Sequence, residues 1–190
     1  MPSRNEENDE LLNLLKKVFG KNNVEKEWDV AANSEDAYTR NLYVPRIDYA
    51  IRPFNRSNDS ERRNKDLEDM QISFHNHKDL FTSLTEYANY PENFNHDFRF
   101  NSNPRCFVAI EVEYSTSMKH RMGSMINASA MGKVAIMVAE TSNVMKSFER
   151  IANYLKYLER IKKLDTTPQN LILIEMKDLK KLLSEYIENR

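Results

Sequence analysis

Residues 111–139, EVEYSTSMKHRMGSMINASAMGKVAIMVA, are the stretch of sequence that decides the fold. The stretch begins at the end of an apolar strand predicted over 105–114 and continues through a short polar turn. A helix is predicted over 118–131 and ends before Gly132, because glycine is typical immediately after a helix. The apolar run 133–139 then predicts a buried strand. A strand, a helix and a second strand in this order indicate an α/β domain.

Segments on both sides of this stretch extend the alternation of helices and strands. Apolar residues at helical spacing predict four further helices, and apolar runs predict two further strands and a short one at Trp28 and Val30. The predicted helices cover about 9–19, 78–90, 142–163 and 177–189, and the predicted strands cover 42–54 and 171–175. We therefore expect one α/β domain over residues 1–190, with a central mixed β-sheet flanked by helices.

Two polar segments interrupt this pattern. Residues 55–69 are dense in Asn, Ser, Asp, Glu and Arg, which predicts a polar surface loop, with a disordered segment as the alternative. Residues 91–104 are rich in Asn and predict a second, long loop.

The composition limits the classes of function. The formal net charge of −1 gives no global basic field, so a nucleic-acid partner would have to be met by a local basic patch. Cys106 is the single cysteine, which excludes an intramolecular disulfide framework. The longest apolar run, 134–139, is too short to span a bilayer, and residues 1–10 have no apolar run typical of a signal peptide. A cytoplasmic protein without membrane contact is expected.

Two glutamates stand near the end of the apolar strand 105–114. Strict alternation places Phe107, Ala109, Glu111 and Glu113 on one face and the residues from Cys106 to Val112 with even numbers on the other. Ionised carboxylates in such a strand are costly unless they are compensated, and a divalent cation is one compensation. A solvated face, or ion pairs with nearby Arg and Lys, is the alternative for the two glutamates alone.

Asp48 is a third acid embedded in an apolar strand. Alternation places Ile47, Tyr49 and Ile51 on one face of that strand and Asp48 on the other, with Ala50 and Arg52. If the two strands pair, Asp48 and Glu111 could share one ion.

The strand VPRIDYAIRPF, residues 44–54, and the segment 105–139 together resemble the PD-(D/E)xK, restriction-endonuclease-like superfamily of nucleases. Asp48 matches the metal-binding aspartate of that motif, and Glu111 matches its Asp/Glu position. The resemblance implies a restriction-endonuclease-like fold and a Mg²⁺- or Mn²⁺-dependent endonuclease. Asp48 and Glu111 would hold the metal, and the expected reaction is hydrolysis of phosphodiester bonds in DNA.

The chain departs from the motif at position 113, where the resembled superfamily has a lysine and this sequence has Glu113. Glu113 is a candidate catalytic residue as general base or further metal ligand, and Lys119 is a candidate source of the missing ammonium group. Lys119 as a plain solvent-facing lysine is the alternative. An acid in the first helix of the superfamily maps onto Glu10, and Asn127 is a candidate supporting residue behind the site.

Candidate nucleic-acid contacts surround these acids. Lys119, His120 and Arg121 begin a predicted helix, where backbone N–H groups also favour phosphate. Arg46 and Arg52 flank Asp48 on its predicted face. Each of these could be an ordinary solvated charge, but as a group they predict a rim that faces phosphate.

Two alternatives to an active nuclease remain open at this stage. The missing lysine is consistent with a catalytically inactive nuclease-fold subunit that binds nucleic acid or protein. An interaction protein without a nucleic-acid role is the third hypothesis. A homodimer through the helix 142–163 or the C-terminal helix is open under each of them.

Overall fold

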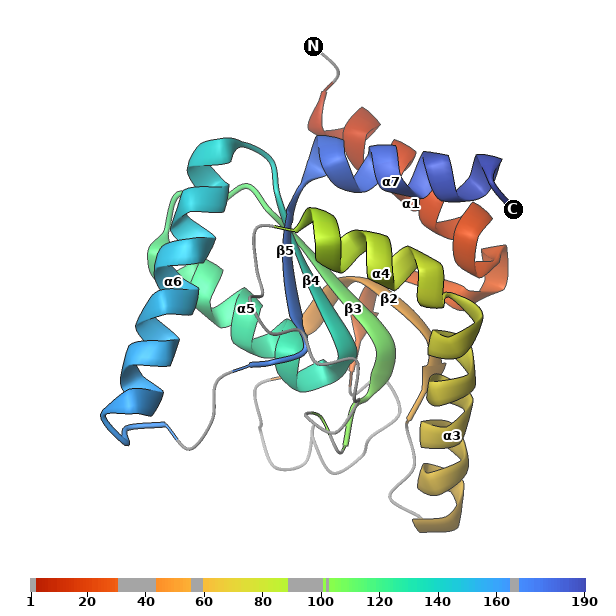
Figure 1. Ribbon diagram of the computed structural model, residues 1–190, viewed down its shortest axis with the longest axis horizontal. Helices are drawn as coiled ribbons and strands as arrows, with labels where there is room; N and C mark the ends of the chain where they lie inside the picture. Colours follow the sequence, from red (N-terminus) through yellow and green to blue (C-terminus); the bar gives the residue numbers. More distant parts are fainter. Residues whose placement is uncertain (1–2, 31–43, 56–59, 89–100, 102, 165–167) are drawn as a thin grey trace.

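The computed structural model describes residues 3–30, 44–55, 60–88, 101, 103–164 and 168–190, and five strands in these residues form one sheet in the order β1-β2-β3-β4-β5 (Figure 1). The strands are β1 Val24–Asp29, β2 Arg46–Phe54, β3 Cys106–Glu113, β4 Gly132–Ala139 and β5 Leu171–Glu175. β1, β2 and β3 pair antiparallel, whereas β3, β4 and β5 pair parallel. The prediction of a single α/β domain with a mixed sheet is confirmed.

Helices cover both faces of the sheet, as Figure 1 shows. The helices α1 Arg4–Phe19, α3 Ser60–Asn76, α4 Lys78–Tyr87 and α7 Met176–Glu188 cover one face, and α5 Met118–Met131 and α6 Ser142–Arg160 cover the other. A single 3-10 turn, Lys21–Asn23, joins α1 to β1. None of the helices within the described ranges combines the length and the apolar character needed to cross a membrane.

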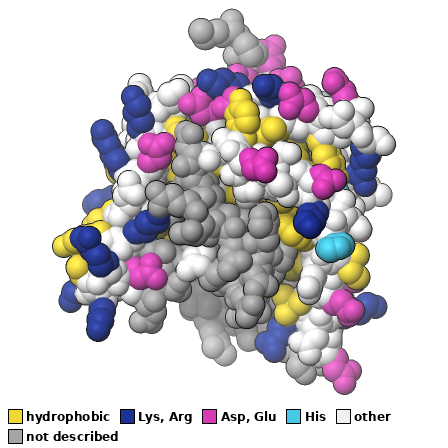
Figure 2. Space-filling view, in the orientation of Figure 1, with side chains coloured by type: hydrophobic (Ala, Val, Ile, Leu, Met, Phe, Trp, Pro, Cys, Tyr) yellow, Lys and Arg dark blue, Asp and Glu magenta, His cyan; other side chains and the backbone are white. Residues whose placement is uncertain are grey.

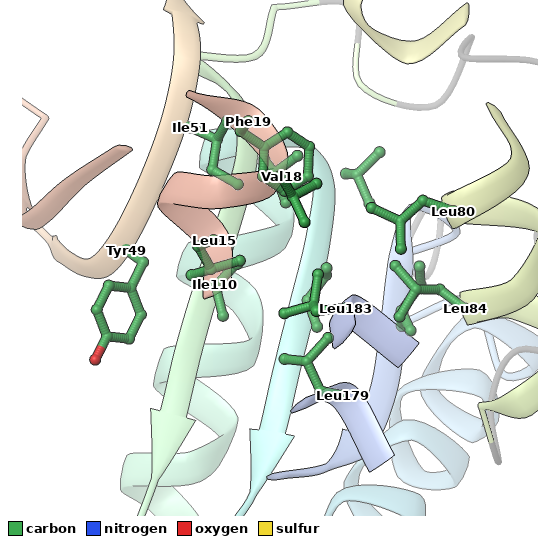
Figure 3. Packing of buried hydrophobic residues seen from close by; sticks show 14 of the residues in the cluster. Leu15, Val18, Phe19, Tyr49, Ile51, Leu80, Leu84, Ile110, Leu179 and Leu183 are labelled. Carbon is green, nitrogen blue, oxygen red and sulfur yellow. The ribbon is translucent and has the colours of Figure 1, made fainter. Parts of the chain in front are cut away.

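The larger core lies between the sheet and the layer of α1, α4 and α7. Figure 3 shows leucines of these helices in one cluster with Ile51 of β2 and Ile110 of β3. The side chain of Tyr49 lies at the margin of this cluster, with its hydroxyl group directed away from the other labelled residues. This core therefore packs against the parts of β2 and β3 that lie next to Asp48 and Glu111.

The second core, under α5 and α6, uses small side chains on the sheet. Ala109 of β3 and Ala135 and Ala139 of β4 are fully buried there against α5 and α6. Small residues let a helix approach a sheet closely. The helix α5 therefore lies against β3, the strand that carries both Glu111 and Glu113.

The first helix begins earlier than the sequence pattern indicates, at Arg4. Ser3 caps it: the Ser3 hydroxyl accepts a hydrogen bond from the Glu6 N–H, and the Glu6 carboxylate accepts one from the Ser3 N–H at 2.6 Å. Residues 4–8 thereby extend α1 ahead of the apolar stripe. These added turns carry Asn8, which contacts the candidate site.

The prediction of a surface loop over 55–69 is wrong for residues 60–69, which form the first part of α3, while 56–59 lie outside the described residues. The segment is mostly polar, but a few apolar residues in and after it recur at helical spacing. Met70 and Phe74 are buried, and Leu67 packs against them. Most of the loop predicted over 91–104 also lies outside the described residues.

Strict alternation in β3 fails at its first residues. Cys106 lies in the core under α5 and α6 together with Ala109, whereas Phe107 lies in the opposite core with its ring edge-on to Phe19 and Phe81. The register between β2 and β3 shifts by one residue between Ile51 and Phe54, next to this point. The predicted faces of Cys106 and Phe107 are therefore wrong.

The start of β4 depends on a glycine. A Cβ atom at Gly132 would lie 2.3 Å from the Val134 carbonyl oxygen and 2.9 Å from the Ala109 Cβ, whereas a Cβ at Gly123 in α5 meets nothing within 4 Å. We expect Gly132→Ala to lower the free energy of unfolding by at least about 1–3 kcal/mol through overpacking. Gly123→Ala should raise it by about 0.5–1 kcal/mol because alanine is the better helix former. Urea unfolding of both variants measures this, and equal effects of the two substitutions would contradict the packing described here.

Candidate functional site

The two acids of the predicted motif lie side by side where β2 and β3 separate. Regular pairing of these strands extends to Tyr49 and Ile110, so Asp48 and Glu111 are the next residues along. Beyond that pair, the Val112 N–H donates to the Asp48 carboxylate at 2.8 Å rather than to a backbone carbonyl of β2. Asp48 therefore replaces the backbone of its own strand as hydrogen-bond acceptor, and its carboxyl group lies between the two strands.

The backbone of β2 is irregular at Asp48. Ile47 is buried in the core under α5 and α6, whereas Tyr49 is buried in the opposite core, so the strand does not alternate regularly between them. The prediction that Ile47 shares a face with Tyr49 is wrong for this reason. Glu27, which lies opposite Asp48 on β1, has a φ of 51°, a left-handed conformation that is uncommon for residues other than glycine. Asp48 itself is half-buried at this irregular point of the two strands.

Burial and mutual repulsion shift the pKa values of this pair. Glu111 is only 8% exposed, and its burial, followed by the charge and the hydrogen bond of Asp48, raises its pKa to about 9. Burial also raises the pKa of Asp48, and the charges of Glu27 and Glu113 add to the shift, while the hydrogen bonds from Val112 and Glu111 oppose it. Near neutral pH, Glu111 therefore holds a proton that it shares with Asp48.

A small pocket of about 160 Å³ opens beside Asp48. Residues from α1, β1, β2 and the end of β3 line it: Asn8, Lys26, Glu27, Asp48, Tyr49, Val112 and Tyr114. The Tyr114 hydroxyl donates to the Asn8 side-chain oxygen at 2.6 Å, and the Tyr49 hydroxyl donates to the Asn8 carbonyl at 3.1 Å. Burial raises the pKa of Tyr114 to about 12, so its phenol stays protonated as the donor. Lys26 lines this pocket as well, and its ammonium lies 4.0 Å from the Asp9 carboxylate of α1.

Glu113 faces α5 rather than this pocket. It is 4% exposed, accepts a hydrogen bond from the Ser115 N–H at 2.6 Å and another from the Ser124 hydroxyl at 3.4 Å. The His120 Nε2 lies 3.7 Å from one of its carboxylate oxygens. Glu113 thus fastens the turn after β3 to the start of α5, and it places an exposed histidine next to a buried acid.

The remaining predicted residues are divided between the surface and other contacts. Lys119 is exposed on the first turn of α5, and Arg46 is exposed at the start of β2. Arg52 forms an ion pair with Glu25 of β1. Lys119 and His120 are thus exposed at the start of α5, whereas Arg52 is engaged with β1.

Three other predicted residues lie away from the pocket. Arg121 is buried and donates from Nη1 to the Ser147 hydroxyl of α6 at 2.6 Å, which joins the two helices. Glu10 forms an ion pair with Lys180 of α7 at 2.6 Å. Asn127 is half-buried on α5. None of the three lines the pocket beside Asp48.

Sequence reasoning missed the pocket residues Asn8, Lys26, Glu27 and Tyr114. Asn8 lies on helical turns that the apolar stripe does not include, and Lys26 and Glu27 lie on an edge strand with few apolar residues. Tyr114 directly follows Glu-x-Glu in the sequence, so it was the one member with a usable signal.

No protein-family model, no curated protein and no solved structure matches this chain. Within the described ranges, no group of three or more His, Cys, Asp and Glu side chains is arranged to hold a metal ion. Asp48 and Glu111 offer two carboxyl groups in contact, and Mg²⁺ commonly takes one or two carboxylates from a protein and completes its shell with water and phosphate oxygens. The donor set of this pair fits such an ion.

The raised pKa of Glu111 predicts a pH dependence of stability for the metal-free protein. The folded state binds more protons than the unfolded state between the ordinary pKa of 4.5 and the folded value of about 9, so the free energy of unfolding should fall as pH rises through that window. Glu111→Gln should flatten this dependence, because its neutral amide does not titrate. Denaturant unfolding in EDTA at both ends of the window measures it.

The matched control is Glu86→Gln, at an exposed glutamate on α4. It should leave the pH dependence of the parent protein in place. An identical pH dependence in the parent and in Glu111→Gln would contradict the proton-sharing pair.

Proposed function

We propose that this chain is a Mg²⁺- or Mn²⁺-dependent endonuclease that hydrolyses phosphodiester bonds in DNA. The observation that carries the proposal is the contact between the carboxyl groups of Asp48 and Glu111 at the point where β2 and β3 separate. The charges of Glu27 and Glu113 also act on this pair. A cation bound between Asp48 and Glu111 would offset the negative charge around this pair and lower the free energy of the folded protein.

Asp48 and Glu111 would hold the ion through hard oxygen donors, and Glu111 would lose its proton on binding. Bound there, Mg²⁺ would polarise the scissile phosphate and lower the pKa of a coordinated water. The hydrogen bond from the Val112 N–H keeps one Asp48 oxygen fixed between the strands. The other Asp48 oxygen would then bind the metal ion.

The chain supplies two further groups on opposite sides of the pair. On the side of α1, Lys26 lines the same pocket as Asp48, and its ammonium, which lies 4.0 Å from the Asp9 carboxylate, would offset negative charge on a phosphate. On the side of α5, the exposed His120 lies beside Glu113 and would move a proton to or from water or a leaving oxygen. Lys26 and Lys119 are thus both candidates for the role of the lysine that the resembled superfamily has where this chain has Glu113.

The arrangement of the matched segments also supports the proposal. Segment 44–54 contains β2, and segment 105–139 contains β3, α5 and β4. β3 pairs with both β2 and β4, so the two halves of the resemblance meet in one sheet with their acids in contact.

A catalytically inactive, nucleic-acid-binding subunit is the second candidate. The observation that favours it is the environment of Glu113, whose two oxygens are engaged by Ser115, Ser124 and His120. A residue held in this way serves the turn after β3 and does not replace the chemistry of a lysine. This candidate predicts binding of DNA with no cleavage in any divalent ion.

Cleavage of supercoiled and linear DNA in Mg²⁺, Mn²⁺, Ca²⁺ and EDTA tests the proposal. We expect cleavage in Mg²⁺ or Mn²⁺ that is absent in EDTA and that falls by more than about 100-fold in Asp48→Asn and Glu111→Gln, because loss of even an outer partner of a metal ligand costs about 10–100-fold. Glu86→Gln, on α4, serves as the control and should retain full activity. Cleavage that persists in EDTA, or in Asp48→Asn, would refute this site.

A further inference from the structure

The outward side of α6 carries basic and aromatic side chains that the proposed site does not use. We name the following six exposed residues the outer face of α6: Lys146, Arg150, Tyr154, Tyr157, Arg160 and Ile161. Tyr154 and Tyr157 are 51% and 46% exposed, and the Arg160 guanidinium lies over the Tyr157 ring at 5.4 Å. Two flat rings thus lie among cations on one side of a helix.

The charge of this segment is opposite to that of the chain. Residues 146–163 contain six Lys and Arg residues and two Glu residues, a net charge of +4, in a protein whose formal net charge is −1. Figure 2 shows Lys and Arg side chains gathered, with hydrophobic ones between them, along the side of the molecule where Figure 1 places α6. Such a local patch is what a polyanion requires of a protein without a global basic field.

The other side of α6 is committed to the core. Val144, Phe148, Ile151 and Leu155 are buried against the sheet and α5. A helix that binds a membrane surface uses its apolar face for that purpose, and here that face is not free. Exposed tyrosines between cations fit a partner that offers both phosphates and flat bases, which is a single-stranded nucleic acid.

The helix α6 begins at the end of the sheet where Glu113 lies. β3 and β4 are parallel, with Glu113 in register with Ala139, and α6 starts at Ser142 shortly after β4 ends. The hydrogen bond from Arg121 to Ser147 joins the first turn of α5 to the second turn of α6. A single-stranded nucleic acid bound along α6 would therefore extend toward the end of β3 that carries Glu113.

We propose that the outer face of α6 binds single-stranded nucleic acid, with phosphates on Lys146, Arg150 and Arg160 and bases stacked on Tyr154 and Tyr157. As an account of how substrate reaches the acids, the inference rests on the proposed function. Binding of nucleic acid by the outer face of α6 does not depend on the proposed function and is measurable without cleavage.

Fluorescence anisotropy of the full chain with labelled oligothymidylate in EDTA tests it. Tyr154→Ala combined with Tyr157→Ala should weaken binding on the order of 10-fold per stacked base, and should weaken binding of a duplex less. Lys146→Gln combined with Arg150→Gln should reduce the slope of log affinity against log salt by about 0.7 for each phosphate that these side chains no longer neutralise.

The chain offers a matched control for the tyrosines. Tyr87 on α4 is 46% exposed, with the Lys181 ammonium 5.7 Å from its ring centre, so it reproduces the exposure and the neighbouring cation of Tyr157. Tyr87→Ala should leave binding unchanged. Circular dichroism melting of each variant verifies that it is folded.

The other outcomes separate this inference from the proposed function. Unchanged oligonucleotide binding in folded α6 variants overturns the inference, whether or not DNA is cleaved. The inference is also overturned if these substitutions abolish only self-association in sedimentation, or only binding to phosphatidylserine vesicles, since α6 would then serve a second copy or a membrane. Binding that depends on α6 in a protein that cleaves no DNA supports the inference and counts against the nuclease.

Discussion

The hydrogen bond from the Val112 N–H to the Asp48 carboxylate is the contact on which the site depends. It lies where the pairing of β2 and β3 stops, and it puts an acidic side chain in the place of a backbone acceptor. Asp48 is thereby held against Glu111 in a largely buried position, where two negative charges are costly. A proton on Glu111 removes one of these two charges, and under the proposed function a divalent cation would take the place of that proton.

The two layers of helices give the acidic pair two different surroundings. On the side of α1, Asn8 accepts hydrogen bonds from Tyr49 and Tyr114 and so fixes the wall of a pocket that Lys26 also lines. On the side of α5, Glu113 anchors the helix start and lies beside His120. The sheet therefore lies between Lys26 on one side and His120 on the other, with the proposed metal ligands Asp48 and Glu111 at its strands. The small side chain of Ala109 lies in the core beneath α5, and Gly132 lets β4 begin against β3 without a steric clash.

Strong local signals made most of the elements readable from the sequence. The bounds predicted for α5 and β5 are those observed, because Gly132 ends the helix and a short apolar run defines the strand. Acids embedded in apolar strands also identified Asp48 and Glu111 as neighbours on condition that their strands pair, which they do. The parts that escaped prediction depend on tertiary contacts: the break in alternation at Ile47, the helix in a polar segment and the arrival of Lys26 from an edge strand. Periodicity carries no information on such contacts.

The central claim is that Asp48 and Glu111 form a divalent-cation site, and anomalous diffraction from crystals containing Mn²⁺ tests it most directly. The account predicts an anomalous peak between the two carboxyl groups, with the remaining ligands supplied by water, and no peak there in crystals of Asp48→Asn. Well-ordered crystals in saturating Mn²⁺ that show Asp48 and Glu111 still hydrogen-bonded to each other, with no peak between them, would contradict it.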